Sequence, residues 1–230
     1  GANSESDEDT LFSFYDPTSL PSTVAAVPPY ADRHGGQTVV VSGAGIQPLG
    51  AELLCRVGGE DGIEVPAEFI SMEKVRCMLP PAPAEWDGEE AWASVCVVHA
   101  GSAPAGCTAH VEFYDPHSPP VLQKLAPRLL PLHSETDEPL HVFGLNMAPM
   151  GDKLLCSFDG GSPVPASFVK GDEVKCTAPD SSEAKAIYVS VSIDGGQQFS
   201  EPLPFVRFDK DRPPMLKSLD PLYAPLHTPV

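Results

Sequence analysis

Apolar and polar residues alternate in short runs along the whole chain. Leu53, Cys55 and Val57 fall on one side of such a run, while Leu54 and Arg56 fall on the other. A period of two is typical of a β-strand with one buried face. The same alternation occurs in 75–79, 154–158 and 174–178. Each of these segments is therefore predicted to be a strand that points a cysteine into a core.

Eight runs rich in β-branched and aromatic residues are predicted as strands, because Gly, Pro, Asp or Asn closes each of them. They are 37–43, 51–58, 73–79 and 93–99 in the first half, and 140–144, 153–160, 172–178 and 187–196 in the second. The 27 Pro and 19 Gly among 230 residues are more than a helical protein tolerates. The chain is thus expected to be all-β.

Two homologous units are present. "GAELLCRV" at 50–57 returns as "GDKLLCSF" at 151–158, and "AEFISMEKVRCMLPP" at 67–81 returns as "ASFVKGDEVKCTAPD" at 166–180. A chain of 230 residues accommodates two domains of ordinary size. With about seven strands in each unit, two tandem immunoglobulin-like β-sandwiches are the expected fold.

A third repeated element marks the joins between units. "LFSFYDPTSLP" at 11–21 is matched by "HVEFYDPHSPP" at 110–120 and, more loosely, by "PFVRFDKDRPP" at 204–214. We therefore divide the chain into residues 1–17 (a tag or linker and the last strand of a preceding repeat, around 11–15), two domains at 18–115 and 116–209, and the first strand of a following repeat in 210–230, around 215–219.

The link between the two domains is short and rich in proline. It consists of Asp115, Pro116, Pro119 and Pro120 with two residues between them. Proline fixes its own φ and restricts the residue before it, so the link is expected to be extended. Domains whose chain enters and leaves at opposite ends would then be arranged end to end, as a stiff rod.

Each unit resembles an IPT/TIG domain, the immunoglobulin-like module of plexins, Met-type receptors and some transcription factors, and is similar to filamin-type repeats. The resemblance is carried by the turn before "TVVVSGAGI", the Cys in the "LLC" strand, the "AxF" segment with "VxCxxP", and the closing hairpin "VSVSIDGGQQFSEPLPFVRFD". The second unit has "LPLHSETDEPLHVFG" where Gly-Gly is expected, and the first has a longer hairpin, "HAGSAPAGC", in place of "IDGGQQ". Such modules specify a fold better than a function.

All six cysteines can be paired. The expected disulfides are Cys55–Cys77, Cys156–Cys176 and Cys96–Cys107. The first two pairs occupy equivalent inward positions, and the third spans the last hairpin of the first unit. Burial as free thiols is the alternative for the inward four. Zinc is disfavoured, because the sequence contains no Cys-x-x-Cys and no close Cys/His cluster.

Charge narrows the choice of partners. The net charge of -18 repels phosphate backbones, so nucleic acid is not an expected partner. The chain has no apolar run of about 18 residues and no signal peptide, so it is not expected to insert into a membrane. Acidic clusters at 59–64 and 133–139 are interpreted as solvated faces, not as calcium sites. No cofactor is expected.

No arrangement of residues indicates catalysis. The seven His are scattered, and no Gly-rich loop precedes a helix, so we expect no enzyme. Trp86 is expected to be exposed and is a candidate contact residue, whereas Trp92 is expected in the core.

Three function classes remain open. The favoured one is a secreted or cell-surface adhesion or receptor module that binds a protein partner, by analogy with the gamete adhesins of green algae, whose GC-rich genomes would suit this composition. The second is an intracellular filamin-like scaffold of a cytoskeletal or ciliary assembly, in the cytoplasm. The third, a transcription-factor TIG module, is disfavoured by the negative charge.

Overall fold

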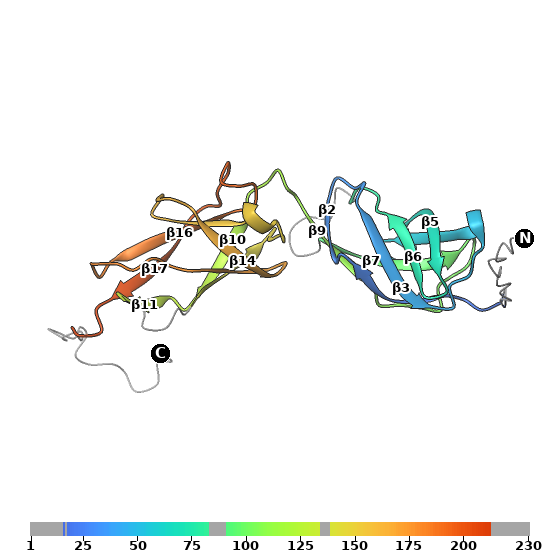
Figure 1. The fold of residues 1–230 in the computed structure, drawn as a ribbon, viewed down its shortest axis with the longest axis horizontal. Helices are drawn as coiled ribbons and strands as arrows, with labels where there is room; N and C mark the ends of the chain where they lie inside the picture. Colours follow the sequence, from blue (N-terminus) through green and yellow to red (C-terminus); the bar gives the residue numbers. More distant parts are fainter. Residues whose placement is uncertain (1–15, 17, 83–90, 134–138, 213–230) are drawn as a thin grey trace, which may run out of the picture. The chain divides into compact units, whose positions relative to one another are not determined.

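The chain forms two compact units, each an immunoglobulin-like β-sandwich (Figure 1). The computed structural model describes residues 16, 18–82, 91–133 and 139–212. The described residues contain strands and two single turns of 3-10 helix, Gly50–Glu52 and Gly151–Lys153. The strands expected around 11–15 and 215–219 lie outside the described residues, as does most of the acidic cluster at 133–139. The all-β fold expected from the strand pattern is confirmed.

The first unit contains nine strands that form one continuous hydrogen-bonded order, β2-β9-β7-β4-β5-β6-β3-β1-β8. They are β1 (Ser22–Val27), β2 (Tyr30–Asp32), β3 (Thr38–Ala44), β4 (Leu53–Val57), β5 (Ile63–Ser71), β6 (Lys74–Met78), β7 (Trp92–His99), β8 (Gly106–Cys107) and β9 (His110–Tyr114). The core lies between the two layers and consists mainly of Val, Leu, Ala and Cys side chains, including Val39, Val41, Leu53, Val75 and Val97.

Strand β5 belongs to both layers of the first sandwich. Its first half, 63–66, pairs antiparallel with β4, and its second half, from Ala67 to Ser71, pairs antiparallel with β6. The change of partner falls directly after Pro66, which lacks a backbone N–H for continuing a ladder. The two layers are thus joined by hydrogen bonds along this side of the sandwich.

The second unit repeats the same strand order without an equivalent of β8: β10-β12-β15-β14-β13-β16-β17-β11. Its strands are β10 (Val121–Ala126), β11 (Leu129–Pro131), β12 (Leu140–Leu145), β13 (Leu155–Phe158), β14 (Val164–Lys170), β15 (Glu173–Cys176), β16 (Ala186–Ser192) and β17 (Leu203–Phe208). The excess over the expected seven strands per unit arises because the first strand of each unit is divided in two, and because β8 is added to the first unit.

One glycine in each unit allows the first strand to approach its neighbour. A Cβ on Gly43 would lie 1.9 Å from the carbonyl oxygen of Ser22, and a Cβ on Gly144 would lie 2.2 Å from that of Val121. Any side chain at these positions would therefore displace β1 or β10. This requirement explains why "SG" and "FG" end the equivalent strands in the sequence.

Two disulfides cross the cores at equivalent positions. Cys55–Cys77 joins β4 to β6, and Cys156–Cys176 joins β13 to β15. All four cysteines are fully buried. The third disulfide, Cys96–Cys107, joins β7 to the additional strand β8. The first two bonds thus connect the strands on either side of the shared strand, β5 or β14.

Arg207 is the largest fully buried side chain in the described part of the chain, and the sequence pattern does not predict it. It lies in β17 at the position that Phe113 takes in β9. Its guanidinium donates to the carbonyl oxygens of Pro131 (2.6 Å), Ala178 (2.9 Å) and Pro179. A buried cation that binds three backbone carbonyls joins three segments of the second unit.

Two expectations about the first unit are wrong. Trp92 is 56% exposed, because its neighbour Ala93 points into the core and successive side chains of β7 alternate between faces. The hairpin of the first unit is also no longer than that of the second. The connections 100–109 and 193–202 contain ten residues each.

The disulfide across each core should contribute strongly to stability. We expect the double substitution Cys156→Ala and Cys176→Ala to lower the free energy of unfolding of the second unit by about 3 kcal/mol, because it restores loop entropy to the unfolded chain. Urea titration of the unreduced protein measures this change. Val121→Ala, an exposed site, serves as the control. A loss below about 1 kcal/mol would contradict the entropic account.

Candidate functional site

The phrase that repeats at the domain joins forms the same turn three times. The carboxylates of Asp16, Asp115 and Asp209 accept hydrogen bonds from the backbone N–H two residues later, at 2.9, 2.9 and 3.0 Å. The carbonyl oxygen of each Asp also accepts from the N–H three residues later. Asp stabilises such turns because its short side chain reaches the following backbone. The aspartate that the three copies of the phrase share therefore stabilises a turn.

Two of these turns are each held by a side-chain amide from a later loop. Asn146, in the loop after β12, accepts from the Asp115 N–H (2.7 Å) and donates to the carbonyl oxygens of Asp115 (3.0 Å) and Ser118 (2.8 Å). Gln47, in the loop after β3, likewise donates to the carbonyl oxygens of Asp16 and Ser19. The turn at 115–118 is in this way attached to the loop that follows β12.

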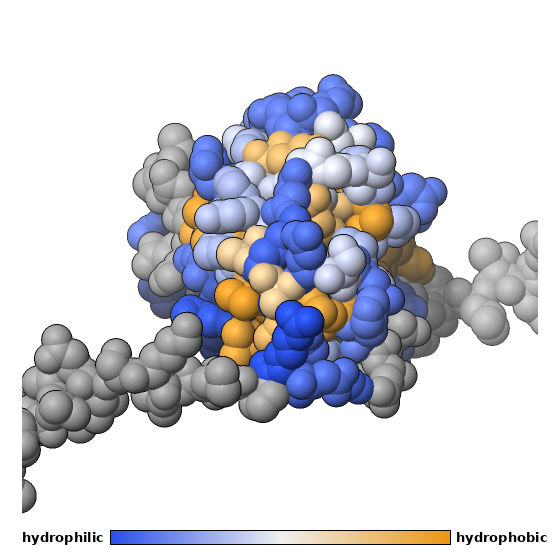
Figure 2. Space-filling view, turned by 90° about the vertical axis from the view of Figure 1, so that its left-hand side faces the viewer, coloured by the Kyte–Doolittle hydropathy of each residue, from blue (hydrophilic) through white to orange (hydrophobic). Residues whose placement is uncertain are grey.

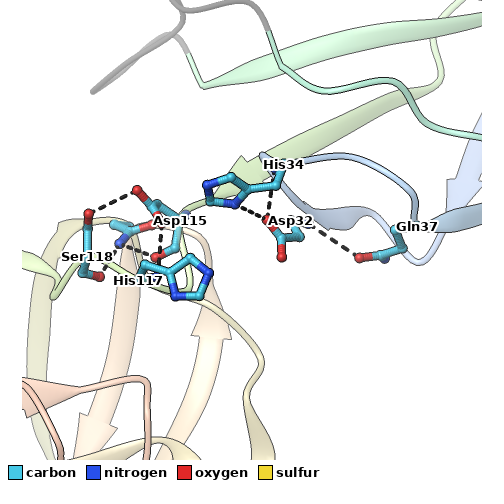
Figure 3. A network of polar contacts seen from close by, with 7 residues as sticks. Asp32, His34, Gln37, Asp115, His117 and Ser118 are labelled. Atoms are coloured by element: carbon cyan, nitrogen blue, oxygen red, sulfur yellow. Dashed lines mark hydrogen bonds and ion pairs between the residues drawn. The ribbon is translucent and has the colours of Figure 1, made fainter.

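Figure 3 shows the polar contacts around the turn at Asp115. Ser118 donates its hydroxyl to the Asp115 carboxylate at 2.9 Å. On the loop between β2 and β3, Nδ1 of His34 lies 2.7 Å from the carboxylate of Asp32, and Gln37 accepts from the Asp32 N–H at 3.3 Å. These contacts order two short polar segments of the chain.

Hydrogen bonding lowers the pKa of two of the turn carboxylates, Asp16 and Asp115. Burial raises the pKa of Asp115. The His117 N–H, the Ser118 hydroxyl and nearby His34 and Arg33 lower this pKa by more than burial raises it, so that the pKa lies below its usual range. For Asp16, the hydroxyl and the N–H of Thr18 lower the pKa. The carboxylates of Asp16 and Asp115 are therefore ionised at neutral pH.

The four linker residues named from the sequence do not behave alike. Asp115 forms the turn, and Pro116 and Pro119 are half-buried. Pro120 is buried, as is its equivalent Pro21, which precedes the first strand of the first unit. Pro120 therefore packs as a part of a sandwich and not as a spacer. The amide side chains that hold the turns were missed, because they lie about 30 residues further along the chain.

The structure describes one of the two tryptophans. Trp86 lies outside the described residues. Trp92, expected in the core, is instead exposed on β7, with its ring 6.4 Å from that of His110 in an edge-to-face arrangement. Among the described Phe, Tyr and Trp residues of the first unit, Trp92 is the one with an exposed side chain.

Each unit has a shallow groove on its described surface, and charged residues line much of the groove in the second unit. In the first unit a groove of about 540 Å³ runs over β5 and β6, where Met78 is exposed. In the second, a groove of about 710 Å³ borders β17, with Phe208, Lys185 and Arg212 in its lining. Figure 2 shows a face of the second unit on which apolar side chains form several groups separated by hydrophilic ones. No single large apolar patch is visible on this face.

Among the described residues, no group of three or more His, Cys, Asp or Glu could hold a metal ion. Within the same part of the chain, no helix has the length and apolar character needed to cross a membrane.

The chain is similar in structure to parts of several solved proteins. One is the extracellular region of plexin A4 (20% identity, TM-score 0.39), of which the chain covers 18% while 82% of the chain is matched. Others are the D1–D4 fragment of ICAM-5 (15%, TM-score 0.30, covering 83% of this chain and 48% of that one) and the adhesin InvE of Yersinia pseudotuberculosis (13%, TM-score 0.31, 84% and 61%). The chain thus spans less than two thirds of each. No family model and no curated protein matches the sequence.

Asn146 should be required for an ordered turn. We expect Asn146→Gly to lower the free energy of unfolding by about 1–3 kcal/mol, because the N–H of Asp115 and two carbonyl oxygens lose their partner. Glycine accepts the positive φ of 61° at this position, so the loss reports the hydrogen bonds. Asn146→Ala adds backbone strain and should cost more. Urea titration checks both, and equal stability of Asn146→Gly and the wild type would refute the role.

Proposed function

We propose that this chain is a non-enzymatic binding module, part of a secreted or cell-surface protein whose tandem immunoglobulin-like repeats recognise a protein partner in adhesion or signalling. The observation that carries the proposal is the pairing of cysteines. All six are in disulfides, and none is free. Fully paired cysteines are typical of oxidising compartments and rare in the cytosol.

Three further features support this assignment. The two sandwiches have ordered strands and short connections, which is the architecture of many modules that present a surface to a partner. The strongly acidic surface disfavours nucleic acid. The IPT/TIG resemblance of both units, and the analogy with gamete adhesins of green algae, indicate a more specific family and setting within this class.

A filamin-like intracellular scaffold is the second candidate. It is favoured by one observation, the strand β10, which has a paired neighbour on one side only within the described residues. Edge strands of this kind accept a strand from a partner. The two candidates differ in the redox state of the cysteines, since a cytosolic scaffold would keep them reduced.

Counting thiols separates these candidates. We expect the protein isolated without reductant from its native source to show no titratable thiol after denaturation, and peptide maps to contain the three disulfides Cys55–Cys77, Cys96–Cys107 and Cys156–Cys176. Reduction in denaturant before the count provides the control and should release six thiols. Six thiols in the unreduced native protein would overturn the extracellular assignment.

We also propose that the proline-rich link makes the pair of units a stiff spacer. Pro116 and Pro119 restrict the backbone of the link, and Pro120 packs at the start of the second sandwich, so little hinge motion should remain. Small-angle scattering should give a maximum dimension well above that of one globular protein of this mass. The triple substitution Pro116→Gly, Pro119→Gly and Pro120→Gly should broaden the distance distribution. A compact particle, or no effect of the substitution, would contradict the proposal.

A further inference from the structure

The ten-residue connection before the last strand of each sandwich follows a different path in the two units. In the first unit, residues 100–109 cross to the first strand, where β8 pairs in parallel with β1. The N–H of Ala105 donates to the carbonyl of Pro21, and the N–H of Thr108 to that of Thr23, each at 2.9 Å. The disulfide Cys96–Cys107 holds this segment in place. The outer edge of β1 is therefore covered by the chain itself.

In the second unit the same connection folds back on β16. The carboxylate of Asp194 accepts from the N–H groups of Gln197 (2.9 Å) and Gln198 (3.1 Å), which closes a compact turn. The N–H of Ser200 then donates to the carbonyl of Val191 at 2.9 Å. This segment bonds within the hairpin and, through the N–H of Gly195, to the carbonyl of Lys153 (3.0 Å), and it does not pair with β10.

The disulfide that fixes the crossing in the first unit has no counterpart in the second. The strand registers place Ala186 where Trp92 lies and Val206 where Glu112 lies. By this register, Ser190 and Glu201 take the positions of Cys96 and Cys107. The second unit thus lacks both cysteines that hold β8 over the edge of β1 in the first unit.

The exposure of the first strands reflects this difference. Thr23, under β8, is 2% exposed, whereas Leu122, which takes the equivalent position after the Asp turn, is only half-buried. Val121 is 58% exposed. The carbonyl of Val121 points toward Gly144 in β12, so the backbone of Leu122 faces the outer edge. Within the described residues no strand pairs with this edge.

We infer that the outer edge of β10 binds an extended strand of a partner protein, which adds in parallel as β8 does in the first unit. This inference rests on the proposed binding function and names its surface. An uncovered strand edge is a template for backbone pairing. Because the first unit fills its edge with a short segment of small residues, the partner strand should be short and have small side chains. Pro120 and Pro127 bound the site at both ends.

The charge on β10 favours a partner strand with an acidic residue. Lys124 is the one charged residue of β10 and is exposed. Its Nζ lies 5.7 Å from the centre of the Phe143 ring, and no carboxylate is paired with it among the described residues. A partner strand with an acidic residue at this point would gain a charge interaction. A second copy of the chain is a poor occupant, because both copies carry a net charge of -18.

The first unit supplies a probe for this edge. A fluorescent peptide of residues 102–109 with Cys107→Ser and Ala109→Glu reproduces the β8 segment and places a carboxylate near Lys124. We expect it to bind the 230-residue protein with a Kd of about 0.1 mM, measured by fluorescence anisotropy. Lys124→Glu in the protein should weaken binding about tenfold, and a peptide with Ala109→Lys should restore it. Ala25→Glu, at the equivalent position of the covered strand β1, should have no effect.

A backbone variant tests strand pairing directly. Leu122→Pro removes the N–H of the outer edge, where proline is tolerated in a strand, and should weaken peptide binding at least tenfold. Its melting temperature shows whether it folds. If it does not, the charge exchange at Lys124 decides alone. Absence of binding up to about 1 mM, or binding unaffected by Lys124→Glu, overturns the inference.

Sedimentation of the free protein tests whether a second copy of the chain occupies this edge. Self-association that Lys124→Glu or Leu122→Pro abolishes would assign the edge to a second copy and would also overturn the partner-strand inference. The thiol count is independent of both results. A protein with no free thiol that fails to bind the peptide retains the extracellular assignment and loses only this binding edge.

Discussion

Each sandwich depends on one strand that is shared by both of its layers. Strands β5 and β14 pair with one layer through their first half and with the other layer through their second half. The two layers are therefore parts of one continuous hydrogen-bonded order, and the core is enclosed along that side without a loop. The disulfides Cys55–Cys77 and Cys156–Cys176 connect the strands that flank the shared strand. Backbone pairing and covalent bonding thus hold the same side of each sandwich closed.

The turn at the domain joins is the second recurrent element. An aspartate builds it locally, and an amide side chain from the loop after β3 or β12 holds it. The first unit uses Gln47 and the second uses Asn146, from different positions of that loop. The same contact is thus preserved although the residue that makes it is not, which indicates that the placement of the turn, and not a particular side chain, has been maintained between the repeats.

Alternation along single strands predicted the fold and the inward cysteines, because a period of two is a local property that packing preserved. It failed at Trp92, where the expectation rested on residue type and ignored the register set by Ala93 and Val95. Other features depend on contacts between distant segments. The burial of Arg207 requires carbonyl groups from two remote segments, and the amide contact of Asn146 spans about 30 residues. The path of the connection before the last strand could not be predicted from its length, since both contain ten residues.

The disulfide between β7 and β8 affects how many open strand edges a tandem protein of this kind has. Duplicating a domain duplicates every edge it has, and the number of equivalent sites rises with each repeat. Binding strength then rises steeply through multivalency whenever the spacing of the sites matches that of the partner. A single cysteine pair that folds one loop over one edge subtracts a site without disturbing the core. Under the inference that the open edge of β10 binds a partner strand, the number of such sites depends on which repeats carry a disulfide equivalent to Cys96–Cys107.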